Sequence, residues 1–476
     1  METLRHCLPP SVQRTLSELP ESLDETYERI LKEIKKPNRA YARRVLQCLA
    51  VAVRPLRVAE LAEVFTVDFN DVEGIQKLNA GWRWEDQEQA LLIACSSLIA
   101  IVEADDSRIV QFSHFSAKEF LTSSRLATAS GEASNYHIDL ASAHTTLAQA
   151  GLCLLLQTSD DVDGHTPEDH PLAQYAAQHW TTHAQFEDVS LRLQKGMEYL
   201  FDRDKPHFEV WRTLYDIDTK PSPGGSAIFY QFSNSRKTAG TPLYYAALCG
   251  FHDLVEHLII KYPRDVNANG GYCVRPLVAA LAREQFRTAD LLHRSGADPD
   301  PRGNYMWTPL HSAAFYGDLK AVQKLIEYDA DIGAEDWEGY TALHHASEGS
   351  NPGDFSVLQL LLEHDADVNA RAVDGSTPLH NASFHGALDV VTLLLERGAN
   401  VNAETEDGST PLHKPSYYGS KEVVRLLLEH GADVDARGKL NCLTPLQLAS
   451  ICGVPEVVRM MLERTADVDV RENGSH

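Results

Sequence analysis

The sequence lacks any uninterrupted apolar run of about 18 residues, the length that a membrane-spanning helix needs. Its opening stretch, METLRHCLPPSVQRTLSELP, also lacks the continuous apolar segment of a secretory signal. Cysteine is sparse, and none of the eight forms a C-x-x-C pair, which makes a thiolate metal site a poor fit. We therefore expect reduced, buried thiols, no membrane contact and a cytoplasmic protein.

Basic residues are also in deficit. The 43 Lys and Arg stand against 68 Asp and Glu, which gives a net charge of −25. Such a field repels phosphate, so nucleic acid is not an expected partner. The motifs G-x-x-x-x-G-K-[ST], H-E-x-x-H and G-x-S-x-G do not occur in the sequence. We therefore expect no enzyme activity, no catalytic residue, no cofactor, no metal and no small-molecule substrate.

The sequence does contain a repeat. The phrase T-P-L-H-x-A, complete or degraded, recurs seven times with spacings close to 33 residues, which is the ankyrin signature. The repeats start near Thr241, Arg275, Thr308, Thr341, Thr377, Thr410 and Thr444. We predict a mainly α fold: an ankyrin-repeat α-solenoid with short β-hairpin fingers, preceded by a winged-helix-like domain and a helical spacer.

The residues of one repeat explain the pattern. Thr308 can cap the first helix, and Pro309 at its first position needs no backbone donor. Gly317 follows where the helix has to stop in a left-handed conformation. The recurring histidines are expected to bond across the turn to the next repeat, because stacked helices about 8–10 Å apart hold them too far from one another to share a zinc ion. They are His311, His344, His380 and His413.

Some repeats depart from the pattern. Repeat two has Glu284 where glycine is expected, and repeat four has an insertion at 349–353. Repeat six has Pro415 where the others have alanine, so we predict a locally loosened helix there. Repeat seven is expected to act as a C-terminal cap with polar Glu463, Arg464 and Asp467.

The N-terminal half lacks this period. Ser22 to Glu25 predicts a capping box that opens a helix, and Asn38 is expected to cap the next helix. A hairpin is predicted from 98–102 and 108–112, and helices followed by one hairpin are typical of a winged helix. We predict a winged-helix-like domain with leading helices at 1–125, a helical spacer at 126–215, a linker at 216–239 and ankyrin repeats at 240–472.

The phrases LPESLDETYERILKEI, LQCLAVAVRPLRVAELAEVF, QFSHFSAKEFL and QYAAQHWTTHA resemble fungal NACHT–ankyrin proteins, which are NLR-like (STAND) signal-transducing ATPases. The resemblance implies a winged helix and spacer, normally preceded by a nucleotide-binding module, and an ankyrin recognition arm. The P-loop of that module is missing here, so no residue inherits an ATPase role. A truncated gene and a natural paralogue without the motor both remain open.

The sequence allows three other interpretations. DNA binding by the winged helix is disfavoured because its candidate helices carry Glu60 and Glu63, or Glu85, Asp86 and Glu88. A metal site at His165, Asp169 and His170 is disfavoured by the loose spacing of these ligands. An ATPase fragment that needs its missing module is the alternative to the favoured function, a protein-interaction scaffold.

The expected partner is a protein of unknown identity, bound on the concave face of the stack. Aromatic residues, which often anchor interfaces, precede the helix-ending glycines. We expect the first of each pair, Phe315, Phe384 and Tyr417, to pack internally, while the second can pack or bind. The candidate partner-binding residues are Tyr316, Trp337, Tyr340, His385 and Tyr418.

Overall fold

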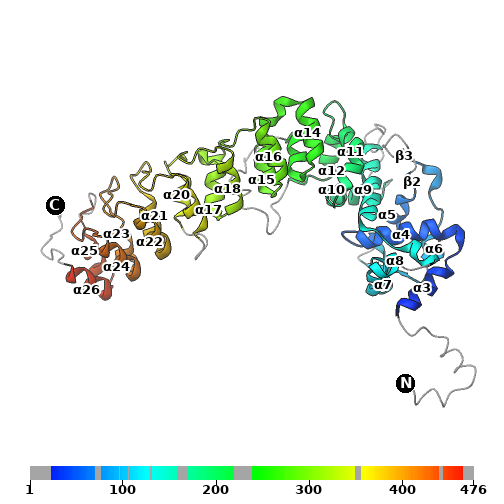
Figure 1. Ribbon diagram of the computed structural model, residues 1–476, viewed down its shortest axis with the longest axis horizontal. Coiled ribbons are helices and arrows are strands. Elements are labelled where there is room, and N and C mark those ends of the chain that lie inside the picture. Colours follow the sequence, from blue (N-terminus) through cyan, green and yellow to red (C-terminus); the bar gives the residue numbers. More distant parts are fainter. Residues whose placement is uncertain are drawn as a thin grey trace, which may run out of the picture. The chain divides into compact units, whose positions relative to one another are not determined.

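The computed structural model describes residues 23–69, 77–95, 97–104, 107–128, 131–157, 170–218, 239–271, 273–348, 355–438 and 443–464. The chain separates into two compact units, Met1–Ile217 and Asp218–His476. The first unit mixes helices with two small sheets, and the second consists of paired helices (Figure 1).

The front part of the first unit is a winged helix. Its sheet has the order β1-β5-β4 with antiparallel neighbours, and Val110 of the central strand pairs with Leu56 on one side and Ile101 on the other. The helices are α3 (Leu23–Glu33), α4 (Arg39–Val51), α5 (Val58–Val64), α6 (Gln87–Cys95), α7 (Phe115–Leu121) and α8 (Ser124–Thr128). The strands are β1 (Leu56–Arg57), β2 (Val67–Asp68), β3 (Lys77–Leu78), β4 (Ile99–Ala104) and β5 (Ser107–Phe112).

The rear part of the first unit is helical, as the sequence predicts. It contains α9 (Leu140–Gln157), α10 (Ala173–Ala184), α11 (Val189–Leu200) and α12 (His207–Leu214). Gly151 lets α9 approach α10 closely, since a Cβ there would lie only 3.2 Å from that of Trp180. Trp211 packs edge-on against Trp180 and donates its indole N–H to the carbonyl of Ala177 at 3.0 Å. This aromatic cluster is the core of the spacer.

The described part of the second unit contains seven consecutive helix pairs, which follow one another in a row from green to red in Figure 1. The pairs are α13 (Pro242–Cys249) with α14 (His252–Lys261), α15 (Pro276–Ala282) with α16 (Phe286–Arg294), α17 (Pro309–Tyr316) with α18 (Leu319–Glu327), α19 (Ala342–Ala346) with α20 (Ser356–Glu363), α21 (Pro378–His385) with α22 (Leu388–Glu396), α23 (His413–Tyr418) with α24 (Lys421–Glu429), and α25 (Pro445–Ile451) with α26 (Pro455–Glu463).

The predicted helix stop is confirmed. Gly317 ends α17 with φ +74°, a left-handed conformation that glycine adopts without a Cβ clash. Repeat two keeps the same turn without glycine, because Glu284 takes φ +55° at the equivalent position. A non-glycine residue pays about 1–2 kcal/mol for this conformation. The geometry of the stack therefore dictates the turn even where the residue is unfavourable.

The helices predicted to start at Asn38 and at the T-P-L of repeat six begin differently in the structure. Asn38 precedes α4, but its side chain does not cap that helix; instead its Nδ2 donates to the carbonyl of Ile93 at 3.4 Å. The predicted side-chain cap is therefore wrong: Asn38 has helical backbone angles, φ −93° and ψ −6°, instead of the extended ones typical of a capping residue. In repeat six α23 begins only at His413, whereas the other T-P-L helices begin at or next to the proline. Pro415 offers no N–H to the carbonyl of Pro411, so the first turn is not helical.

Three predicted features lie outside the described residues. These are Ser22 of the capping box, the insertion at 349–353 and Asp467 of the expected cap. Most of the predicted linker, from 219 to 238, also lies outside them.

Candidate partner-binding groove

The corners of repeats three to six are each built by a threonine and a histidine. In repeat four the Nδ1 atom of His344 accepts the backbone N–H of Thr341 at 3.1 Å. Since Nδ1 accepts, Nε2 carries the hydrogen and donates it to the carbonyl of Ser376 in the next repeat at 3.2 Å. The same pair of bonds occurs at His311 and His380.

The cross-turn role predicted for these three histidines is therefore confirmed. Burial lowers the pKa of His311, His344 and His380 to about 4, so each is neutral at physiological pH. Neutral histidines that already bond on both nitrogens serve as structural staples between repeats.

The fingers that follow each corner are tight loops. They close through backbone bonds, such as Ala372 N to Ser376 O at 2.8 Å and Thr405 N to Ser409 O at 2.9 Å. Among the described residues of this unit no finger contains an assigned strand, so the hairpins are shorter than a β-ladder requires. Neighbouring fingers are joined in turn, because Glu406 N donates to the carbonyl of Asp374 at 2.7 Å. The fingers thus form a continuous edge along the stack.

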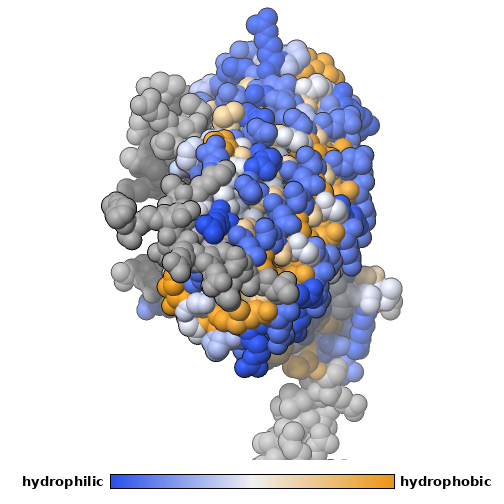
Figure 2. Space-filling model, turned by 90° about the vertical axis from the view of Figure 1, so that its left-hand side faces the viewer, coloured by the Kyte–Doolittle hydropathy of each residue, from blue (hydrophilic) through white to orange (hydrophobic). Residues whose placement is uncertain are grey.

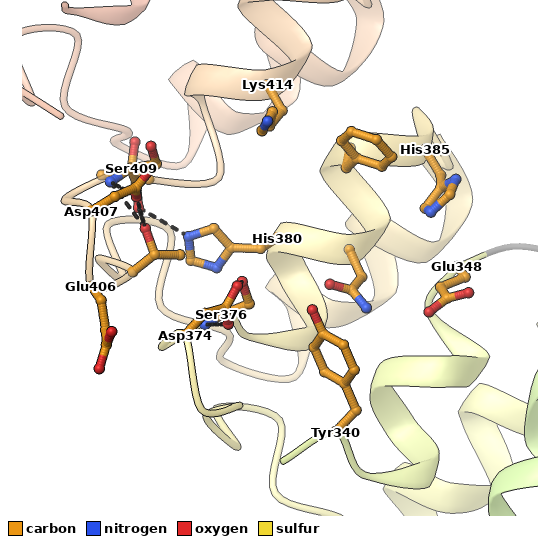
Figure 3. Close-up of a pocket in the computed structure, with 14 residues that line it drawn as sticks. Tyr340, Glu348, Asp374, Ser376, His380, His385, Glu406, Asp407, Ser409 and Lys414 are labelled. Carbon is orange, nitrogen blue, oxygen red and sulfur yellow. Dashed lines mark hydrogen bonds between the residues drawn. The ribbon is translucent and has the colours of Figure 1, made fainter. Parts of the chain in front are cut away.

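Between this edge and the first helices lies a cavity of about 570 Å³. Figure 3 shows Asp407 and Glu406 on one side of it, Glu348 on the other, and the Tyr340 side chain between them. The helices α21 and α23 supply the inner wall, which includes His380, Phe384, His385 and Lys414. A cavity of this size falls within the range of ligand pockets. We call it the groove pocket.

The chain resembles known protein families over both units. The family "Ankyrin repeats (3 copies)" matches residues 276–372, 335–405, 350–438 and 379–472. The family "GPI inositol-deacylase, winged helix domain" matches residues 27–138. Residues 276–472 are ankyrin repeats. The winged helix predicted from one hairpin and its flanking helices is likewise confirmed, and the match covers only that domain of the deacylase family.

Individual relatives share parts of the chain. Azaphilone pigments biosynthesis cluster protein L of Monascus ruber is 29% identical over 297 residues, which is 60% of this chain and 61% of that protein. Ankyrin repeat and SOCS box protein 5 of Oryctolagus cuniculus is 36% identical over 98 residues, or 21% of this chain and 29% of that protein. The chain therefore spans less than two thirds of the length of either relative. The ankyrin repeat domain of Bcl-3 aligns with 29% identity and a TM-score of 0.43, covering 47% of this chain and 100% of that one.

Two of the five candidate binding residues, Tyr340 and His385, line the groove pocket. Tyr418 lies beside it, with its ring 5.7 Å from that of Phe384. Tyr316 lies elsewhere, half-buried in repeat three against Phe315. The structure thus brings together three of the five candidates.

Trp337 lies at a fingertip rather than in the pocket. It is 57% exposed and contacts Tyr305 of the preceding finger, with ring centroids 5.8 Å apart. Tyr305 and Met306 both have positive φ, +56° and +59°, and both are exposed. Backbone of this kind is strained for non-glycine residues and persists only where its surroundings hold it. Sequence reasoning missed these two residues because neither follows the repeat signature.

The expectation that the first aromatic of each pair packs internally is wrong for two of the three. Phe384 and Tyr417 are 42% and 47% exposed, and only Phe315 is half-buried, against Trp307 and His345. Phe315 packs against the buried ring of Trp307, whereas Phe384 and Tyr417 both contact the exposed ring of Tyr418. Sequence reasoning also passed over the groove carboxylates, because Asp374 and Asp407 each precede a glycine in a dipeptide typical of tight turns.

The acidic residues of α5 do not face solvent. Glu60 is fully buried and accepts a bidentate pair of bonds from Arg54 at 2.7 and 2.9 Å, together with the backbone N–H of Arg57. Burial raises its pKa, but these hydrogen bonds outweigh that effect and lower it overall. Glu63 is also buried and accepts the N–H of Leu172 at 2.7 Å. The premise that these two carboxylates repel DNA is therefore wrong, because both are buried and accept hydrogen bonds within the first unit.

His170, one of the three weighed as metal ligands, contacts Glu63 through Nδ1 at 3.1 Å. His165 and Asp169 lie outside the described residues. Among the residues described, no group of three or more His, Cys, Asp or Glu side chains is arranged to hold a metal ion. None of the helices described is both long and apolar enough to cross a membrane.

The free cysteines of the described segments are buried except Cys452, and burial raises the pKa of the Cys48 and Cys249 thiols to about 12. Cys7 and Cys442 lie outside the described residues. The buried thiols behave as small hydrophobic side chains.

The end of the last repeat is mixed in character. Glu463 and Arg464 are exposed as expected of a cap, but Ile451 and Leu462 are 66% and 46% exposed. Figure 2 faces this end of the stack, and hydrophobic side chains gather at its surface there. Polar residues therefore cover this end only in part.

Proposed function

We propose that the chain is a protein-interaction scaffold that binds a protein partner through the concave ankyrin groove. Ankyrin repeats indicate a role in protein interaction, and the groove pocket with its exposed aromatic rim is the observation that carries the proposal. Phe384 and Tyr418 are exposed although they belong to helices whose other faces are buried, and their rings lie 5.7 Å apart. Exposed aromatics beside a cavity are typical anchors of an interface.

We further propose that this scaffold is the recognition arm of an NLR-like protein of the NACHT–ankyrin type, acting in the cytoplasm. The order of winged helix, helical spacer and ankyrin repeats supports this, as does the likeness to a fungal pigment-cluster protein. Recognition alone would then be the task of this chain, without chemistry of its own. The proposed domain limits are 1–125, 126–215, 216–239 and 240–472.

A test uses the full chain as bait for proteins of its own host, with Phe384→Ala and Tyr418→Ala as variants. Ile260→Ala is the matched control, because Ile260 is 77% exposed on a second helix, away from the groove. The proposal expects the same partner to be lost from both groove variants and kept by the control. Equal capture by all three variants and the native chain would refute the groove as the binding surface.

A second candidate function is a fragment of a NACHT signal-transduction ATPase. The winged-helix match at 27–138 favours it, since such a segment follows the nucleotide-binding module in the resembling family. Its test is nucleotide binding and hydrolysis by this chain alone and when mixed with a separately produced P-loop module. Hydrolysis that rises on mixing would favour this candidate, and hydrolysis unchanged by the chain would count against it.

A further inference from the structure

The groove pocket carries an excess of negative charge. Four carboxylates line it, those of Glu348, Asp374, Glu406 and Asp407, and they face a single ammonium group on Lys414. The carboxylates come from two successive repeats and lie around the cavity rather than on one side of it (Figure 3). An anionic ligand would be repelled here, whereas a cation would be attracted from several directions.

Two of the carboxylates are held in place by their own turns. Asp374 accepts the backbone N–H and the hydroxyl of Ser376, both at 2.8 Å. Asp407 accepts the N–H of Ser409 at 3.0 Å. Fixed acceptors of this kind need no reorganisation when a donor arrives, and each carboxylate still has lone pairs to offer.

The third feature is aromatic. The Tyr340 ring is half-buried in the pocket wall, and the Phe384 ring is 42% exposed at its rim. The ammonium of Lys414 already lies 5.7 Å from the centre of the Phe384 ring, so this ring face accepts a cation within the chain itself. Carboxylates combined with aromatic faces match a guanidinium, which is planar, permanently charged and able to stack.

From these observations we propose that the groove pocket takes an arginine side chain presented by the partner protein. The proposal rests on the proposed function, since it specifies the chemistry of the partner that the groove binds. Glu406 and Asp374 are the principal acceptors, because the backbone bond between their fingers places the two residues side by side. Lysine, a point charge without the planar fork, would bind there more weakly.

The test uses the full chain and immobilised pools of degenerate peptides that share one fixed central residue. The pools carry arginine, citrulline, lysine or glutamate at that position. Citrulline keeps the shape of arginine without its charge. The expected result is retention of the arginine pool over the citrulline pool by about fivefold or more, with the excess falling as salt is added.

Two variants locate the effect. Glu406→Gln should reduce the preference for arginine over citrulline about fivefold. Glu404→Gln is the matched control, because Glu404 is an exposed carboxylate on the same finger that does not line the pocket. It should leave the preference unchanged.

The outcomes distinguish the arginine proposal from the broader proposal that the groove binds a protein. Equal retention of the citrulline and arginine pools, with both lost in Phe384→Ala, would overturn the charge preference while the groove remained a protein-binding surface. Retention of no pool at all would overturn both. An arginine preference that survives Glu406→Gln unchanged would overturn the assignment to this pocket.

Discussion

The corner histidine of repeat four offers a direct test of how neighbouring repeats are held together. Repeat seven supplies the substitution, because Gln447 occupies the equivalent position there and its Oε1 accepts the N–H of Thr444 at 2.9 Å. His344→Gln should therefore keep the N-terminal cap of α19. It removes a group that takes up a proton when the chain unfolds.

The magnitude follows from the pKa. His344 has a pKa of about 4 in the folded chain, against 6.5 as the ordinary value. Because the folded pKa is the lower one, the unfolded chain binds the proton first, and stability falls as the pH drops from about 6.5 to about 4. At pH 5 this single histidine costs the native chain about 2 kcal/mol relative to neutral pH.

His344→Gln removes this pH-dependent loss of stability, but it also removes the hydrogen bond from Nε2 to the carbonyl of Ser376. A hydrogen bond of this kind is worth about 1 kcal/mol. The variant should thus be about 1 kcal/mol less stable than the native chain above pH 7 and about 1 kcal/mol more stable at pH 5. The two stability curves should cross at about pH 5.8.

The assay is urea unfolding of the full chain at several pH values between 7.5 and 5, with hydrogen exchange of the α19 and α21 amides to localise the change. His364→Gln serves as the control, because His364 is an exposed histidine of the same repeat. Its stability curve should run parallel to that of the native chain. Parallel curves for His344→Gln as well would show that burial of this histidine does not couple folding to protonation.

Three further substitutions are expected to stabilise the stack. Asp300→Asn should raise the free energy of unfolding in urea by about 1–3 kcal/mol. Among the described residues the buried Oδ1 of Asp300 has no hydrogen-bond partner, whereas Asn369 donates its Nδ2 to a carbonyl 29 residues later, a bond that an asparagine at 300 could also form. Glu284→Gly should raise the melting temperature through a gain of about 1 kcal/mol, since relief of its positive φ outweighs the exposed ion pair to Lys320. Pro415→Ala should slow hydrogen exchange in α23 and add about 1–3 kcal/mol by restoring a backbone donor; unchanged exchange would contradict the loosening attributed to this proline.

The sequence was sufficient for the repeats because each repeat is a local unit. Thr308, Pro309 and Gly317 determine where one helix begins and ends through contacts within ten residues or so, and the period repeats that information. The hairpin of the winged helix was equally legible, since its two strands are adjacent in the chain.

Features that depend on distant contacts were not accessible in this way. Strand β1 has only two residues, Leu56 and Arg57, and exists because β5 pairs with it some fifty residues later. The burial of Glu63 depends on His170 and Leu172 of the spacer, 107 and 109 residues later in the chain, which no local pattern connects to α5. The groove pocket depends on several repeats at once, so individual residues could be nominated but not their arrangement.

The exposed side chains of the groove can specify a partner because the contacts that hold the repeats together lie elsewhere in the stack. Between repeats the polar groups of the loops are paired by a ladder of asparagines: Asn369 and Asn402 each donate to a carbonyl of the next repeat and accept an N–H from it. The threonine–histidine corners satisfy the helix starts, and small apolar residues fill the stack. Phe384, Glu406 and Tyr418 take part in none of these bonds between repeats, so substituting them should change binding without unfolding the chain. That separation is why the groove variants can test recognition, and why a partner has to be sought by experiment where the solenoid itself could be predicted.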